Sequence, residues 1–138
     1  MSRRTARKQA FLTLYQADLN EQPVSEVLAR WRSYRGHLDE HAVSLADGVE
    51  RERAGLDAVL SEVSEGWPIH RMSVVDRAIL RLALYEMLYV EDVPAEVAIS
   101  EAMEIAKGFS SEESPAFVGG VLRGAAARNP DKDRVGHG

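Results

Sequence analysis

Apolar residues recur along this chain at the three- and four-residue spacing of amphipathic helices, and no segment alternates convincingly with a period of two. The first helical segment spans about residues 3–19. Pro23 then breaks the chain, and Ser25 is expected to cap a second helix. A long third segment follows Gly36 and ends near residues 65–72, where we expect the boundary between two subdomains.

The second half of the chain predicts a central buried helix followed by shorter ones. Ser73 and Asp76 have the spacing of a capping box, and the segment to about Tyr89 is apolar nearly all round. Such a helix usually lies at the centre of a bundle. Pro94 is expected as the first residue of the next helix, with Gly108 as its stop.

A last helix opens with the cap-then-proline pair Ser114-Pro115. Three of its small residues lie four apart and leave a stripe without bulk: Ala116, Gly120 and Gly124. For this stripe we favour packing within the chain over a homodimer contact. The pattern as a whole predicts an all-α bundle of about six to seven helices, forming one domain over residues 1–128. The polar residues 129–138 are expected to be a disordered tail.

Composition narrows the class of protein. The hydrophobic share of 45% and the charged share of 28% are those of a soluble globular protein. The absence of cysteine excludes disulfides, thiolate metal sites and cysteine nucleophiles. No secretory signal follows the first basic residues, and the most apolar run, residues 78–90, is too short to cross a bilayer. We therefore expect a cytoplasmic protein.

Charge is distributed unevenly along the chain. The net charge is −5, yet residues 1–8 carry four cations and no acid, and the first acid is Asp18. The remaining residues hold 13 Lys and Arg against 22 Asp and Glu. A basic end on an acidic body indicates a local contact with an anion.

The basic end forms two rows on a helix, because Arg3 and Arg7 are four residues apart, as are Arg4 and Lys8. With no compensating acid nearby in the sequence, these cations repel one another unless an anion is bound. One interpretation is a solvated amino terminus. The other is a phosphate clamp, since arginine forks match phosphate geometry. Spacing alone leaves both open.

Residues able to carry catalysis do not form a convincing set. His37 and His41 are four apart, as in a zinc site, but no third ligand suggests itself. The pair Gly119-Gly120 lacks the rest of a phosphate loop and lies within a helix. The sequence therefore favours a protein with no catalytic activity, no metal and no cofactor.

Five stretches resemble the NusB family in matching order. They are RRTAR through AFLTLY at residues 3–15, SVVDRAILRLALYE at 73–86, VPAEVAISEA at 93–102, AKGF at 106–109 and FVGGVL at 117–122. The resemblance covers residues 3–127 and is weakest over 20–66, where only helical character agrees.

The resemblance implies an all-α fold of two packed subdomains that binds the boxA element of ribosomal RNA leaders, a single-stranded RNA. It also implies a partner, the ribosomal protein NusE, and a role in the complex that keeps RNA polymerase processive through ribosomal RNA genes. Matching positions imply RNA contacts at seven residues: Arg3, Arg4, Arg7, Lys8 (by adjacency), Phe109, Glu113 and Phe117. They imply NusE contacts at Tyr15 and Asp76.

The chain departs from the family pattern at Ser100 and Gly119, where the family commonly has asparagine. Contacts made by those amides are therefore in question here. Two other classes stay open from the sequence. One is the RNA-recruiting domain related to RsmB-type ribosomal RNA methyltransferases, and the other is a protein-interaction module that binds no RNA itself.

Overall fold

Six α-helices and one short 3-10 turn form the part of the chain that the computed structural model describes, residues 2–128. The elements are α1 (Arg3–Leu19), α2 (Val24–Tyr34), α3 (Glu40–Val63), η1 (Ile69–Arg71), α4 (Val74–Tyr89), α5 (Ala95–Phe109) and α6 (Ser114–Arg128). The prediction of an all-α bundle is confirmed. The tail expected at residues 129–138 lies outside the described residues. None of the described helices is long and apolar enough to span a membrane.

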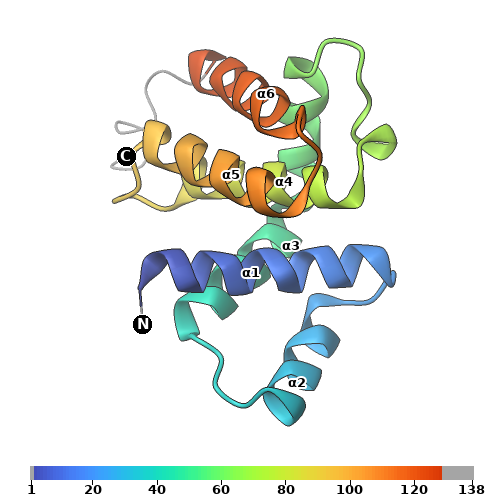
Figure 1. Ribbon diagram of the computed structural model, residues 1–138, viewed down its shortest axis with the longest axis vertical. Coiled ribbons are helices and arrows are strands. Elements are labelled where there is room, and N and C mark those ends of the chain that lie inside the picture. The colour runs from blue at the N-terminus through green and yellow to red at the C-terminus, as the bar shows by residue number, and fades with distance from the viewer. Residues whose placement is uncertain (1, 129–138) are drawn as a thin grey trace.

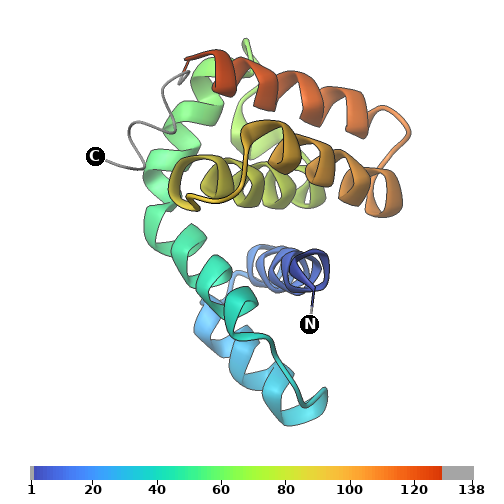
Figure 2. The ribbon, with the colours of Figure 1, turned by 90° about the vertical axis from the view of Figure 1, so that its left-hand side faces the viewer.

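The helices form two groups that share one long helix. In Figure 1, α1 crosses the middle of the molecule, α2 lies below it, and α4, α5 and α6 lie above it. Figure 2 shows α3 passing from the lower group to the upper one without a break. The amino-terminal part of α3 therefore belongs to the group of α1 and α2, and its end belongs to the other group.

Helix α4 is the centre of the core, as its apolar sequence predicts. It packs against α1, α3, α5 and α6, and ten consecutive residues from Ala78 to Met87 are buried. Two of these ten, Arg81 and Glu86, are charged and fully enclosed by partners on other helices. The apolar side chains around them hold the bundle together, and the two charged ones fix its neighbours in place.

Two helix starts differ from the sequence prediction. Ser73 caps α4 as expected, because its hydroxyl accepts from the Asp76 N–H at 3.0 Å. Helix α2, however, begins at Val24 and not behind Ser25, since the Val24 N–H donates to the Glu50 carboxylate of α3 at 2.8 Å. A side chain from another helix thus does the work of a local cap. Pro94 likewise precedes α5 as its cap residue.

Helix α5 ends one residue later than predicted. It runs through Gly108 to Phe109, and the chain turns extended only at Ser110. The Phe109 ring packs on the Phe11 ring of α1, with centroids 5.2 Å apart. This contact holds the last turn in helical form, so Gly108 is not the stop. Gly36 does end α2, with φ at +85°, a conformation that suits glycine.

Small residues allow close packing at Gly48 and at one position of α6. Gly48 lies under the Tyr85 ring, and a β-carbon there would collide with it. On α6, Ala116 and Gly120 are exposed, while a β-carbon at Gly124 would lie in contact with Val63 of α3. The preferred interpretation of that stripe is therefore wrong for its first two members. Helix α6 buries the neighbouring face, made of Val118, Val121, Leu122 and Ala125.

Candidate nucleic-acid interface

The first turn of α1 presents two arginines to acids from the other helical group. The Ser2 hydroxyl starts the helix by accepting from the Thr5 N–H at 3.1 Å. Arg3 then donates two hydrogen bonds to Asp92, at 3.1 and 2.7 Å. Arg4 donates to Glu101 of α5, with the shortest distance 2.9 Å. These hydrogen bonds and the charge of Glu101 raise the pKa of Arg4.

Arg7 is placed differently, because its guanidinium is buried. It forms a bidentate pair with Glu86 of α4, at 2.7 and 2.8 Å. The two side chains are only 6% and 1% exposed. Burial acts to lower the pKa of Arg7, but the hydrogen bonds and charge of Glu86 outweigh it, and the net pKa is raised. The geometry makes Arg7 a tie between α1 and α4.

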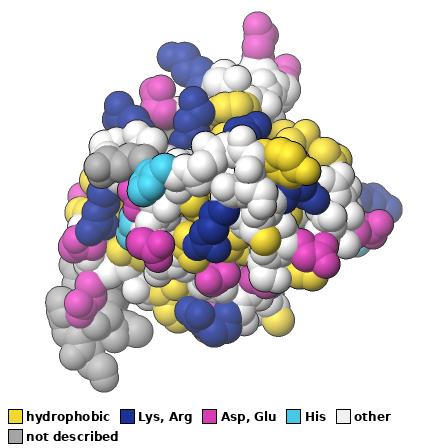
Figure 3. Space-filling view, turned by 90° about the horizontal axis from the view of Figure 1, so that it is seen from below, with side chains coloured by type: hydrophobic (Ala, Val, Ile, Leu, Met, Phe, Trp, Pro, Cys, Tyr) yellow, Lys and Arg dark blue, Asp and Glu magenta, His cyan; other side chains and the backbone are white. Residues whose placement is uncertain are grey.

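The interpretation that the basic end lacks compensating acid is therefore wrong in three dimensions. Each arginine of α1's first two turns has a carboxylate partner from 79 to 97 residues away. Figure 3 shows the same mixing on the lower face of the molecule, where dark blue cations and magenta acids lie side by side. Such a surface attracts anions only where an acid can be displaced or a cation is unpaired.

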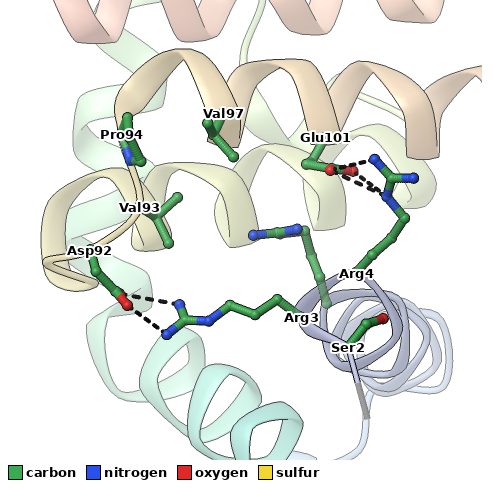
Figure 4. A pocket seen from close by; sticks show the side chains of 9 residues that line it. Ser2, Arg3, Arg4, Asp92, Val93, Pro94, Val97 and Glu101 are labelled. Atoms are coloured by element: carbon green, nitrogen blue, oxygen red, sulfur yellow. Dashed lines mark hydrogen bonds and ion pairs between the residues drawn. The ribbon is translucent and has the colours of Figure 1, made fainter.

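A hollow of about 490 Å³ lies between the start of α1 and the start of α5. Figure 4 shows Arg3 and Arg4 reaching along opposite sides of it toward their acids, with Val93 and Val97 between them. Its lining consists of charged ends and an apolar floor: Ser2, Arg3, Arg4, Arg7, Asp92, Val93, Pro94, Val97 and Glu101. The hollow therefore places two exposed arginines and their carboxylate partners around apolar side chains.

One turn further along α1, Lys8 meets the exposed aromatic of α5. The Phe109 side chain is 44% exposed. Its ring lies 5.5 Å from the Lys8 ammonium and rests on buried Phe11. The Lys8 ammonium lies over the ring, which is tilted by 55° against Phe11, so a partly exposed aromatic and a cation are held together at this point of the surface.

Asp76 holds the turn between α5 and α6. Its carboxylate accepts from the Ser110 hydroxyl at 2.8 Å and from the Ser114 hydroxyl at 3.1 Å. Ser110 follows Phe109, and Ser114 follows Glu113, so the hydrogen bonds fix the segment that carries both. In a capping box the Asp76 carboxylate would accept from the Ser73 N–H, and here it binds the two serines of the turn instead. Ser73 still caps the helix.

The remaining candidate residues lie around this turn and along α1. Glu113 is exposed just before α6, and Phe117 is half-buried one turn later. Tyr15 is half-buried on α1, with its ring 6.2 Å from Phe11. Gly119, a departure from the family pattern, is buried, and a side chain there would meet the Met103 sulfur at 2.8 Å. Ser100, the other departure, is exposed.

The two histidines considered as metal ligands do not gather a third group. Asp39 lies between them in sequence, and its carboxylate accepts from the His41 backbone N–H at 2.8 Å, which caps α3. Across residues 2–128, no three histidine or carboxylate side chains are placed to hold a metal ion.

Sequence reasoning missed the acids that complete the site: Glu86, Asp92 and Glu101. One signal was available for Glu86, because a lone carboxylate within the most apolar helix needs a buried cation. No comparable signal existed for Asp92 and Glu101, which look like ordinary surface acids in the sequence. Only the folded molecule brings these acids, one in the α4–α5 connection and one on α5, to the arginines.

Comparison with known proteins shows which family the chain resembles. The model of the NusB family matches residues 4–127. The transcription antitermination protein NusB of Rubrobacter xylanophilus is 67% identical over 125 residues, 91% of this chain and 90% of that protein. The protein of the same name from Thermobifida fusca is 42% identical over 130 residues, 94% and 92% of the two chains.

Solved structures give the same result. NusB of T. maritima superposes with a TM-score of 0.82 at 34% identity, covering 92% of both chains. A structure described as the antitermination factors NusB and NusE in complex with dsRNA has a TM-score of 0.82 at 25% identity. It covers 91% of this chain and 96% of that chain.

Proposed function

The chain belongs to the NusB family, and from that membership we propose that it is a transcription antitermination factor that binds RNA together with NusE. The ligand is the single-stranded boxA element of ribosomal RNA leaders, and the assembly joins RNA polymerase and keeps ribosomal RNA transcription processive. The names of its relatives support the antitermination role, and the relative solved with NusE and dsRNA supports both partners. The chain has a binding role in this assembly and no reaction of its own.

The observation that carries the proposal is the pairing of Phe109 with Lys8. Single-stranded RNA is recognised through bases stacked on aromatic rings and backbone contacts made by cations. Phe109 is 44% exposed, and the Lys8 ammonium lies over its ring, 5.5 Å from the centroid. Base and phosphate of one nucleotide therefore have adjacent partners. Glu113 and Phe117, just beyond the fixed turn, border the same face; Glu113 accepts from base or sugar donors and repels phosphate.

The arginines of α1 divide into two roles. Arg3 and Arg4 are exposed, and their ion pairs contribute little because water screens them. A phosphate can therefore replace Asp92, which is 66% exposed, at little cost, while Glu101 is only 16% exposed and keeps more of its hold on Arg4. Arg7 cannot leave Glu86 without stranding a buried carboxylate. We assign phosphate contacts to Arg3, Arg4 and Lys8, with Arg7 fixing the helix that presents them.

NusE is assigned to the surface around Tyr15 and Asp76. These residues are on different helices, but Asp18, one turn after Tyr15, pairs with Arg77, the neighbour of Asp76, at 2.6 Å. This ion pair supports a shared contact region. The carboxylate of Asp76 has lone pairs left for a partner's donors after accepting two hydroxyls.

The test is a titration of boxA RNA with the full chain, alone and with NusE, across a salt series. Three cations that each neutralise one phosphate give a slope of log affinity against log salt of about −2 for a single strand. Replacing Phe109 by Ala removes stacking worth about 1–3 kcal/mol per base, while Phe109→Leu retains the contact with Phe11 and serves as the packing control.

Two results would overturn the proposal. One is a salt slope near zero for the parent protein, or RNA binding that is unchanged in an Arg3→Ala, Arg4→Ala, Lys8→Ala triple variant. The other is NusE binding that RNA neither enhances nor depends on, which would favour a protein-interaction module.

A further inference from the structure

The last turn of α2 exposes the helix face that is buried one turn earlier. Val27 and Leu28 are 1% and 4% exposed. Trp31 and Tyr34 lie four and seven residues after Val27, and Arg35 lies seven residues after Leu28. This spacing places all three on the same face of the helix. Trp31 is half-buried, Arg35 is exposed and Tyr34 is 84% exposed. Figure 1 shows α2 as the lowest part of the molecule, where the helix runs past the core.

Three arginines lie at this end of α2, and none has a carboxylate partner among residues 2–128. The guanidinium of Arg35 lies 5.0 Å over the Trp31 ring, and Arg30 donates to the Gln22 amide oxygen at 2.8 Å. Arg32 is exposed on the same turn. No acid occurs in residues 27–38 of an otherwise acidic chain. The positive charge of this turn is therefore uncompensated.

We infer that this turn, the α2 patch (Arg30, Trp31, Arg32, Tyr34 and Arg35), is a second contact for single-stranded RNA. Guanidinium forks bind phosphate, and the open ring of Tyr34 stacks a base. Aromatic rings interleaved with unpaired arginines fit a nucleic-acid strand better than an acidic peptide, which would leave the ring faces unused. The inference rests on the proposed RNA-binding function for the first contact and extends it to a separate helix.

The path between the two contacts is short. The connection from Arg35 to Asp39 is four residues long and reaches at most about 14 Å. At its end the Asp39 N–H donates to the Gln9 side chain at 3.1 Å, and Gln9 follows Lys8 on α1. Leu38 is buried and anchors this connection. A strand leaving Lys8 and Phe109 across α1 therefore meets the α2 patch next.

The experiment compares two RNA lengths on the full chain, about 4 and about 16 nucleotides, which bracket known single-strand site sizes. The variant is Arg30→Ala, Arg32→Ala and Arg35→Ala combined. Its matched control removes the same charge elsewhere, by Arg51→Ala, Arg71→Ala and Arg128→Ala combined. A further pair, Tyr34→Ala and Tyr34→Phe, tests the ring itself, and circular dichroism verifies that each variant folds.

On the long RNA we expect the triple variant to make the salt slope shallower by about 2. Tyr34→Ala should weaken long-RNA binding about tenfold, while Tyr34→Phe and the charge control bind as the parent does. On the short RNA all variants bind as the parent does. Equal losses from the triple variant and its control, or no loss on the long RNA, would overturn the α2 patch.

Loss of NusE binding with unchanged RNA binding would also overturn it, because the patch would then be a protein contact. Failure of the proposed function itself looks different. In that case the Lys8 and Phe109 variants leave short-RNA binding unchanged, whatever the α2 variants do.

Discussion

The amino end of α1 and the carboxyl end of α2 both carry three arginines, and the fold treats them in opposite ways. Those of α1 each meet a carboxylate from the other helical group. Those of α2 meet an amide, an aromatic ring and solvent. In the sequence the first cluster looks like the obvious anion site. In space the second has the uncompensated charge.

The three α1 arginines also differ from one another in how deeply their side chains are buried. Arg7 and Glu86 are enclosed, so their pair is part of the architecture. Arg3 and Arg4 are exposed, and Asp92, the acid beside Arg3, is exposed as well, so that pair is exchangeable, while Glu101 beside Arg4 is only 16% exposed. The comparison teaches that a basic cluster has to be read with its partners, since charge alone does not separate a structural cation from a binding one.

The largest expected effect on the free energy of unfolding comes from breaking the buried Arg7–Glu86 ion pair. Arg7→Met leaves Glu86 buried without a partner and should cost about 3–5 kcal/mol of unfolding free energy, measured by denaturant titration. Arg7→Met with Glu86→Leu should recover most of that loss, because a buried ion pair often exchanges for apolar packing at little cost. A single-variant loss under about 1 kcal/mol would contradict the role assigned to Arg7.

The second effect tests the other end of α1. Burial acts to raise the pKa of Asp18, but the hydrogen bonds of Arg77 and the charges of Arg77 and Arg81 outweigh it, and the net pKa is lowered. A lowered folded-state pKa gives stability that is present above the unfolded value of about 3.9 and lost as pH falls through the folded value.

Asp18→Asn should therefore cost about 2–3 kcal/mol near pH 7, and the difference from the parent should shrink below about pH 4. Thermal unfolding at several pH values measures it. A difference that stays constant down to the lowest pH would contradict the assignment of this stability to the Asp18 carboxylate.

A smaller effect tests the exchangeable pair. Asp92→Asn removes the acid that competes with phosphate for Arg3, so RNA affinity should rise and the salt slope should steepen. Stability should change by under about 1 kcal/mol, since the pair is exposed. Fluorescence anisotropy with boxA RNA measures the affinity, and Glu91→Gln supplies a control with the same charge change next to it. A fall in affinity would show that Asp92 holds Arg3 in the binding geometry.

The smallest effect belongs to the α2 end. Arg32→Ala should change the unfolding free energy by less than about 0.5 kcal/mol, because the side chain is exposed and touches no acid. Denaturant titration beside Arg7→Met gives the contrast directly. A loss comparable with that of Arg7 would remove the distinction between the two clusters.

Much of the fold follows from the sequence because its signals are local. Helical periodicity and the Ser73 cap predict α1 and α4 closely, and the nearly uniform apolarity of α4 predicts its central position. The start of α2 was missed because its cap is Glu50, a side chain from another helix. The end of α5 was missed because packing on Phe11 outweighs the preference of Gly108.

The candidate site follows from the sequence only in part, for the same reason. The cations and Phe109 stand out as residue types, but nothing local indicates that Lys8 and Phe109 meet. The partners of Arg3 and Arg4 are about ninety residues away. Nothing local in the sequence marks the α2 arginines as a site, because the resemblance is weakest there and their lack of acidic partners is a property of the packed molecule.

The unbroken course of α3 has a mechanical consequence. Its 24 residues form a rod about 36 Å long, and any hinge between the two helical groups would have to melt part of it. Contacts on α1 and α2 below and on α5 and α6 above are therefore held at a set spacing before a ligand arrives. An RNA strand that bridges them binds a preorganised surface, so little of the binding free energy is lost to rearranging the protein.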